Sequence, residues 1–489
     1  MSAPAINEQQ IRDLVQDVIA RLKQPMSAAP APASHGPSAR KAGAPNRFGI
    51  FADANEACEA AAHAQKQLAK AGVEGRRKVE EIVKTLCEKN AESWGRIELE
   101  ETKIGRLDHK IEKLKVLKKV PGVDFLRRVA MTGDNGATID ECAPFGVIGA
   151  ITPSTHSIPT LGCNAINMVS AGNAVVFNTH PAASKCAAMA VRAFNEAIHG
   201  ALGIENLLCT AEPPTMESFK AICSNQNIAL LCVTGGPAVV KAAMASGKRA
   251  ICAGPGNPPV VVDETADFDN AAKGIIAGGG YDNNLLCIGE KEIFVTAKAW
   301  NGFIAAFKKA GAFELNAQQI EALTKDAFTF EKGQGAGCPH PVLNKKLVGK
   351  DVSVLAQSAG ANVPSGCELL FGETDADHAF VEEEQMMPFV PVVRVRDAAE
   401  GIERSKHAEH NYRHTAIIHS RNLDTITEMA RVMNTTIFVA NGPCTAGLGG
   451  GGEGYLSYSI ATPTGEGITT PLTYTRFRRL TMSGSLRIY

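Results

Sequence analysis

The fold of this chain is decided by the stretch GVIGAITPSTHSIPTLGCNAINMVSAGNAVVFNTHPAASK, residues 146–185. An uncharged β-type run at 146–152 is followed by an apolar helical run at 157–172 and by a second β-type run at 173–181. The alternation continues with the helical run at 184–200 and with NLLCTA, TMESFKAICS, IALLCVTGG and PAVVKAAMASG. Apolar strands that alternate with helices predict βαβ units and a mostly parallel sheet covered on both faces. We therefore expect an α/β protein whose ligands bind at the carboxyl ends of the strands.

The composition is that of a globular protein with two or three domains, since 45% of the 489 residues are hydrophobic and 21% are charged. A formal net charge of -1 gives no electrostatic reason to expect nucleic acid or an anionic membrane as a partner. No uncharged apolar run is long enough to span a bilayer. The 13 cysteines form no C-x-x-C pair and no secretory segment opens the chain, so we expect reduced thiols in the cytoplasm. No metal site is expected.

The amino-terminal residues are expected to lie outside the main fold. Apolar residues recur at spacings of three and four within residues 1–22, which predicts an amphipathic helix. Residues 23–47 are rich in Pro, Ala and Ser, which is typical of a linker that cannot bury a core. A helix of this kind can pack on its own protein, but the linker favours docking to another chain.

Two strand ends in the α/β region have residues suited to binding a nucleotide. Thr234, Gly235 and Gly236 end a buried strand, and Pro237 takes the first position of the next helix. Glycines let a phosphate approach the backbone, and the helix amino terminus supplies free N–H groups. The alternative is an ordinary strand-to-helix connection, because the G-x-G-x-x-G pattern is absent. Residues 153–156, in TPSTHSIP, give a weaker signal of the same kind.

The segment GGGYDNNLLCIGEKEIFV, residues 278–295, contains a single cysteine. Cys287 lies between a predicted glycine-rich loop with two asparagines and a predicted β-strand. A buried strand would accept a thiol as a small hydrophobe. The junction of a loop and a rigid strand is also where a nucleophile would be presented to a substrate. The residues alone leave both interpretations open.

From about Phe48 to the end, the chain resembles the aldehyde dehydrogenase superfamily and, within it, the CoA-acylating aldehyde dehydrogenases of bacterial microcompartments. The segments that carry the resemblance are TPSTHS, SAGNAVVFNTHPAASK, VTGGPAVV, AGPGNPPVVVDETAD, YDNNLLCIGEKEIFV, EEEQMMPFVPVVRV, HTAIIHSRN, NTTIFVANGPCTAGLGGGGEG and ATPTGEGITT. The amino-terminal helix and its linker resemble the encapsulation peptides of such enzymes. Shell or co-cargo proteins of a microcompartment are therefore the expected partners of residues 1–22, and the microcompartment lumen is the expected location.

The resemblance implies an aldehyde dehydrogenase fold of three parts. A Rossmann-like domain that binds NAD and CoA is expected at 48–124 and 148–255, and an α/β catalytic domain at 256–455. An oligomerisation arm is expected at 125–147 and 470–489. Independently of the resemblance, Asn135-Gly136 is a strong turn signal between two alternating segments, which predicts a β-hairpin. Alternating apolar residues after residue 479 suit a strand that adds to a neighbour's sheet, and a homodimer or homotetramer is expected.

The resemblance also places the chemistry. Cys287 falls on the superfamily's nucleophile, which forms a thiohemiacetal with the aldehyde and then a thioester, with its own backbone N–H as one oxyanion donor. A loop site near backbone N–H groups was expected to favour the thiolate. Thr155 aligns with the asparagine that assists in hydrolytic relatives and is a second catalytic candidate. The cofactor-binding residues that the resemblance implies are Pro153, Ser154 and Thr155 for the nicotinamide, Gly235 and Gly236 for the pyrophosphate, Asn178, Thr179 and His180 for the adenosine, and Glu384 for the nicotinamide ribose.

One departure from the hydrolytic relatives points to the product. Those enzymes carry a glutamate that activates water, and Cys252 stands at the aligned position. A general base must lie within hydrogen-bond reach of the attacking water, so its loss favours transfer of the acyl group to the CoA thiol. The expected reaction is oxidation of a short aldehyde, such as propionaldehyde or acetaldehyde, to acyl-CoA with reduction of NAD. The alternatives are a hydrolytic NAD-dependent dehydrogenase and a non-catalytic cargo or scaffold protein.

Overall fold

The computed structural model describes residues 47–331 and 340–486. The predicted helix at 1–22 and nearly all of the predicted linker at 23–47 lie outside these residues. The chain divides into two compact units. The first comprises the described residues up to Leu86, Pro121–Ala253 and those from Thr469 on, and the second comprises Cys87–Val120 and Gly254–Ile468.

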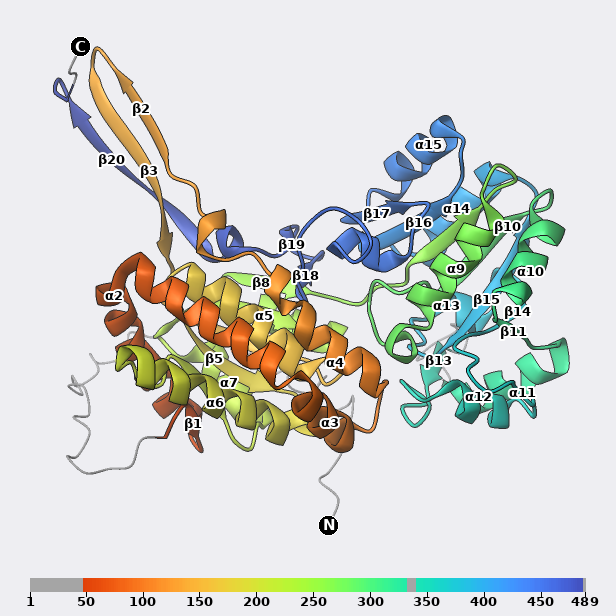
Figure 1. The fold of residues 1–489 in the computed structure, drawn as a ribbon, viewed down its shortest axis with the longest axis horizontal. Helices are drawn as coiled ribbons and strands as arrows, with labels where there is room; N and C mark the ends of the chain where they lie inside the picture. Colours follow the sequence, from red (N-terminus) through yellow and green to blue (C-terminus); the bar gives the residue numbers. More distant parts are fainter. Residues whose placement is uncertain (1–46, 332–339, 487–489) are drawn as a thin grey trace, which may run out of the picture. The chain divides into compact units, whose positions relative to one another are not determined.

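The first unit is built on a six-stranded sheet in the order β1-β6-β5-β4-β7-β8, in which every pair of neighbours is parallel. All residues of β4 (Val147–Thr152) and β5 (Ala174–Thr179) are buried, which explains why both runs are uncharged. The helix between them, α5 (Ser157–Ser170), is buried along its whole length. The predicted alternation of strands and helices is confirmed (Figure 1). The remaining elements of this sheet and its helices are β1 (Ile50–Phe51), α2 (Ala54–Lys89, which continues into the second unit), η3 (Pro181–Ala183), α6 (Ser184–Leu202), β6 (Leu208–Ala211), α7 (Met216–Ser224), β7 (Ile228–Thr234), α8 (Pro237–Met244) and β8 (Ala250–Ala253).

A separate three-stranded antiparallel sheet extends from the first unit (Figure 1). The hairpin predicted at Asn135-Gly136 is present as β2 (Val129–Gly133) and β3 (Gly136–Pro144). The carboxyl-terminal strand β20 (Thr475–Ser483) pairs with β3 of the same chain, so its first partner is internal. Short 3-10 helices η2 (Val123–Phe125) and η6 (Pro471–Tyr474) precede β2 and β20.

The second unit contains a seven-stranded parallel sheet in the order β11-β14-β15-β10-β9-β16-β17. Its central strands β10 (Glu292–Thr296) and β9 (Pro259–Val262) are wholly buried. Two further two-stranded sheets pair β12 with β13 and β18 with β19. The other elements are α3 (Ala91–Thr102), α4 (Leu107–Lys115), η1 (Val116–Lys119), α9 (Phe268–Gly279), η4 (Tyr281–Asn284), α10 (Trp300–Lys309), β11 (Phe313–Glu314), α11 (Ala317–Ala327), β12 (Phe328–Glu331), β13 (His340–Leu343), α12 (Val352–Ser358), β14 (Leu370–Glu373), α13 (Ala379–Glu382), β15 (Phe389–Val395), α14 (Ala398–Ala408), β16 (Thr415–His419), α15 (Leu423–Met433), β17 (Ile437–Ala440), η5 (Cys444–Leu448), β18 (Ile460–Ala461) and β19 (Gly467–Ile468).

The grouping of residues 87–120 differs from the expected domain boundaries. The resemblance implies that 48–124 belongs to the first domain, whereas Cys87–Val120 groups with the second unit. The reason is a set of buried polar contacts from α4 to the residues around η4, which lie 169 positions apart in the sequence where Lys113 meets Asp282. Hydrophobic periodicity gives no indication of such a contact.

Candidate active site

The strand ends expected to bind a nucleotide are brought together in the first unit. Strand β4 lies between β5 and β7 in the sheet, with Thr152 opposite Thr179 and Ile151 opposite Val233. Three loops therefore emerge side by side, and they contain Pro153–Thr155, His180 and Gly235–Gly236. Strand order reverses between β4 and β7, because β5 and β6 lie on one side of β4, whereas β7 and β8 lie on the other. A reversal of this kind is where ligands bind in open α/β sheets.

The individual residues at this edge differ in exposure and contacts. Pro153, Ser154 and Thr155 are half-buried in the loop before α5. Asn178 is buried, and its side-chain oxygen accepts a hydrogen bond of 2.5 Å from the Ser218 hydroxyl. Thr179 is buried and Gly235 is half-buried. His180 and Gly236 are exposed.

The glycine turn that follows β7 is open on one side. Gly236 caps α8, whose first residue is Pro237, as the sequence predicts. A Cβ atom at Gly236 would have no atom within 4 Å, while the Gly235 N–H donates to the Ala253 carbonyl at 3.3 Å. The open side and the start of an eight-residue helix that no side chain caps fit an anionic group such as a pyrophosphate.

In the second unit, Cys287 lies on the connection between η4 and β10 and is half-buried. The expectation of a glycine-rich loop before it is wrong at Gly278 and Gly279, which form the last turn of α9. Close packing explains the glycine at position 278, because a Cβ atom there would lie 2.0 Å from the Glu290 carboxylate. The turn before Cys287 is made instead by Asp282, Asn283 and Asn284, with φ angles of 50°, 57° and 62°.

Three consecutive non-glycine residues in the left-handed region are rare, and Asp and Asn tolerate that region best. Each side chain of this turn is fixed to a different part of the unit. The Asn283 amide donates to the Gly349 carbonyl at 3.1 Å. The Asn284 amide donates to the carbonyl oxygens of Gly279 and Glu290 at 2.9 and 2.8 Å. The turn is thus held from both sides.

Asp282 is the most strongly held residue of the turn. Its carboxylate accepts a hydrogen bond of 2.7 Å from the Arg106 N–H and forms an ion pair with Lys113, and both members of the pair are fully buried. The Asp282 N–H donates to His109 Nδ1 at 2.9 Å. There is no room for a side chain at Gly105, because a Cβ atom would lie 2.3 Å from the Asp282 carboxylate.

On the other side of Cys287, Lys291 is fully buried and its ammonium group contacts the turn. Its Nζ donates to the carbonyl oxygen of Asn284 at 2.9 Å, to that of Leu286 at 3.3 Å, and to the Asn284 side-chain oxygen. Burial lowers the pKa of Lys291, while the negative charge of Glu384 raises it. The cysteine loop is therefore bound to a charged group that hydrophobic patterning would place in solvent.

Glu384, assigned by resemblance to the nicotinamide ribose, lies near Cys287. Burial raises its pKa to about 7, opposed by the positive charge of Lys291 and by a hydrogen bond from the Gly256 N–H. Gly256 also has the Cys287 carbonyl beside it, since a Cβ atom there would approach that oxygen to 2.6 Å and the His414 ring to 2.9 Å. Gly256 therefore packs between the cysteine loop and His414.

The acidity of Cys287 differs from the expectation of a ready thiolate. Its pKa is raised to about 12, first by burial and then by the negative charge of Glu384. The positive charges of Lys291 and Lys113 act in the opposite direction. The resting thiol is therefore protonated, and the protein supplies two buried cations that favour its ionised form.

The position that aligns with the hydrolytic glutamate lies in the first unit. Cys252 is fully buried at the end of β8, which supports the interpretation of its side chain as an apolar filler. All the described cysteines are free thiols. No helix among the described residues is long and apolar enough to cross a bilayer.

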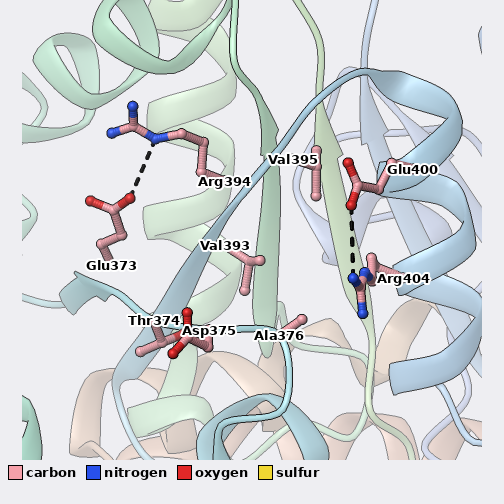
Figure 2. Close-up of a pocket in the computed structure, with 9 residues that line it drawn as sticks. All are labelled: Glu373, Thr374, Asp375, Ala376, Val393, Arg394, Val395, Glu400 and Arg404. Carbon is pink, nitrogen blue, oxygen red and sulfur yellow. Dashed lines mark ion pairs between the residues drawn. The ribbon is translucent and has the colours of Figure 1, made fainter.

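A pocket of about 430 Å³ lies in the second unit, at the carboxyl ends of the strands of its sheet. Cys287 lies at the amino end of one of these strands. Figure 2 shows its wall, which includes the last residues of β14 and β15, whereas the cysteine loop precedes β10. Its two arginines face carboxylates of the same wall, Arg394 with Glu373 at 3.3 Å and Arg404 with Glu400 at 3.8 Å. Both arginines are thus paired within the wall, and the pocket is separate from the cysteine site.

Comparisons with known proteins agree with this geometry. The aldehyde dehydrogenase family model matches residues 37–320, more than half of the chain. The acetaldehyde dehydrogenase (acetylating) EutE of Salmonella typhimurium is 40% identical over 485 residues, covering 99% of this chain and 100% of that protein.

Two solved structures extend the comparison to the fold. The propionaldehyde dehydrogenase of Rhodopseudomonas palustris, with bound CoA and an acylated cysteine, is 41% identical with a TM-score of 0.85. The match covers 89% of this chain and 98% of that one. A propionaldehyde dehydrogenase from the Clostridium phytofermentans fucose utilisation bacterial microcompartment is 42% identical with a TM-score of 0.86, over 90% and 100% of the two chains. The present chain belongs to the aldehyde dehydrogenase family, in the branch of its CoA-acylating enzymes.

Proposed function

We propose that this chain oxidises a short aliphatic aldehyde, such as propionaldehyde or acetaldehyde, to its acyl-CoA with NAD as the hydride acceptor. The observation that carries the proposal is the half-buried Cys287 on a loop fixed by three left-handed residues. A nucleophile held in this way keeps its sulfur in place without reorganisation during the reaction. The relatives of the same branch support acyl transfer from a cysteine to CoA.

Cys287 is proposed to carry the acyl group through both halves of the reaction. Its sulfur adds to the aldehyde carbonyl carbon, and the negative charge that develops on the oxygen is stabilised by the Cys287 N–H, with Thr155 as a second donor. NAD, when bound, supplies the acceptor for the hydride that leaves this carbon. The resulting thioester on Cys287 is attacked by the CoA sulfur, which forms acyl-CoA and releases Cys287.

The nucleotide is proposed to bind to the first unit at the edge where the order of strands reverses. Gly235 and Gly236 would face the pyrophosphate, Pro153 to Thr155 the nicotinamide, and Asn178 to His180 the adenosine. The open turn at Gly236 fits this assignment. In the second unit, Glu384 would hold the nicotinamide ribose. We assign the nucleotide-binding role to 48–124 and 148–255 and the catalytic role to 256–455, with residues 87–120 supporting the catalytic loop.

Transfer to CoA rather than water is proposed because no carboxylate stands at Cys252. The test is NADH formation from propionaldehyde and NAD with and without CoA, with the acyl product identified by mass. We expect propionyl-CoA, and a rate without CoA lower by about 10²-fold, which is the usual contribution of a general base. Propionate formed at the same rate without CoA would instead indicate hydrolysis. Absence of NADH formation with every short aldehyde would favour the non-catalytic cargo or scaffold alternative.

Residues 1–22 are proposed to direct the enzyme into the lumen of a bacterial microcompartment by binding a shell or co-cargo protein. The proposal rests on the amphipathic pattern and the linker in the sequence. Deleting residues 1–22 is expected to leave NADH formation unchanged and to abolish co-localisation with shell proteins in cells that form the compartment. Fusion of residues 1–22 to a fluorescent protein is the control and is expected to carry it inside. Normal packaging of the deletion variant would contradict the proposal.

The sheet of β2, β3 and β20 is proposed to be an oligomerisation arm that binds a second copy of the chain. Its exposed apolar side chains include Val129, Met131, Phe477 and Leu480, and β2 and β20 are its edge strands. Val129, Met131 and Phe477 share one face of the sheet and Leu480 lies on the other, and exposed apolar side chains on a sheet with free edges are typical of an interface. Phe477→Asp with Leu480→Asp is expected to reduce the oligomer to a smaller species in sedimentation. An unchanged oligomer would locate the interface elsewhere.

A further inference from the structure

We propose that Lys291 is a positioning residue that fixes the peptide between Leu286 and Cys287, so that the Cys287 N–H is aimed at the oxygen of the reacting carbonyl. The proposal deepens the proposed function, because the oxyanion it serves forms only if Cys287 attacks an aldehyde. Lys291 itself is fully buried and need not touch the substrate. Its effect is carried through the backbone of the cysteine loop.

The hydrogen bonds of Lys291 fit an ammonium ion. Its Nζ faces three oxygen acceptors, two from Asn284 and one from Leu286. A lysine ammonium group has three N–H donors and no acceptor, so all three donors are used. A neutral amine would direct its lone pair at one of these oxygens. The site therefore requires the charge, although burial lowers the pKa of Lys291.

The direction of the Leu286 carbonyl determines where the next N–H points, and this oxygen accepts two hydrogen bonds, one from Lys291 Nζ at 3.3 Å and one from the Gly289 N–H at 3.0 Å. A peptide unit is planar and trans, so its C=O and N–H point in opposite directions. Because the Leu286 carbonyl is directed at Lys291, the Cys287 N–H is directed away from it. That N–H lies at the sulfur of its own residue, where it lowers the pKa of the thiol. It is therefore placed where the oxyanion of a cysteine adduct forms.

The positive charge of Lys291, like its position, favours the Cys287 N–H as a hydrogen-bond donor. A cation on the carbonyl side of a peptide polarises the peptide and strengthens its N–H as a donor. It also opposes the effects of burial and of Glu384 on the Cys287 thiol. The titratable groups that interact with Lys291 are Glu384, Cys287, Cys444, Glu292, Glu290 and His414. Glu292 is fully buried, and burial raises its pKa well above the usual range.

The test compares Lys291→Met with Lys298→Met, an identical substitution at a largely exposed lysine just after β10. Iodoacetamide alkylation of Cys287 in the full chain without nucleotide or CoA is followed from pH 6 to 11 by peptide mass, with the half-buried Cys367 as internal reference. We expect alkylation of Cys287 in Lys291→Met to be about tenfold slower at pH 8, with the rise in rate displaced to higher pH and Cys367 unaffected. Lys298→Met is expected to match the unsubstituted chain.

Turnover gives a second readout that a purely structural role would not move. We expect kcat for propionaldehyde oxidation to fall by about 10²–10³-fold in Lys291→Met, as on loss of one oxyanion donor, with the KM for NAD unchanged. If Lys291→Met does not fold, Lys291→Gln keeps amide donors without the charge and is expected to show the same shift in alkylation. An unchanged alkylation profile in a folded variant would overturn the proposal. Alkylation needs no aldehyde chemistry, so it tests Lys291 even if the proposed function fails.

Discussion

Replacing Cys287 by alanine is expected to reduce CoA-dependent NADH formation by about 10³-fold or more while leaving the fold intact. The loss is large because the sulfur forms the covalent bond in both halves of the proposed reaction, and no other group can take its place. Cys287 is half-buried on a loop that is held by backbone and side-chain contacts to neighbouring residues, so removing the sulfur leaves those contacts in place. Circular dichroism and steady-state NADH formation, measured on the same preparation, check both parts of the expectation.

The matched control for this substitution is Cys367→Ala. Cys367 is another half-buried thiol of the second unit, and its sulfur donates to the Leu369 carbonyl at 3.5 Å. Its loss is expected to leave turnover near normal. Mass spectrometry during turnover should find the acyl group on Cys287 in the unsubstituted chain and in Cys367→Ala. Near-normal turnover by Cys287→Ala would remove Cys287 from the mechanism.

The strand ends of the first unit could be predicted from sequence because they follow local rules. Uncharged β-type runs alternate with helical runs, and Pro237 follows a glycine pair at a helix start. These signals predict that Gly235, Gly236 and Pro153 lie at the carboxyl ends of strands of one parallel sheet, and the strand order places their loops side by side. The hairpin at Asn135-Gly136 could also be predicted from sequence, since its turn is specified by only two residues.

The surroundings of Cys287 could not be predicted in the same way. Lys113 and Asp282 are 169 positions apart, and a charged side chain in an amphipathic helix is ordinarily assigned to solvent. The run Asp282-Asn283-Asn284 contains three residues that tolerate positive φ, and such a run before a cysteine is a usable signal for a tight turn. Lys291 stands in GEKEIF, which reads as a solvated charge run before a strand, yet all of Glu290, Lys291 and Glu292 are buried.

Replacing Lys113 by methionine is expected to destabilise the second unit by about 3–5 kcal/mol, because it leaves the Asp282 carboxylate buried without its partner ion. The backbone N–H of Arg106 would still donate to the Asp282 carboxylate, but a backbone N–H cannot neutralise the negative charge. Both tryptophans, Trp94 and Trp300, are buried in this unit, so the urea dependence of tryptophan fluorescence reports its unfolding. The same substitution at Lys325, which pairs with Glu321 on an exposed helix surface, is expected to change the midpoint little.

Combining Lys113→Met with Asp282→Asn separates the loss of the ion pair from the loss of packing. Asparagine tolerates the left-handed φ of 50° and keeps an acceptor for the Arg106 N–H, but it carries no charge to bury. The double variant is therefore expected to be more stable than Lys113→Met alone, because breaking a buried pair from one side costs more than replacing both partners. If the double variant were the less stable of the two, the unpaired charge would not be the cause of the destabilisation. Methionine would then act by disturbing the packing of α4 against the turn that presents Cys287.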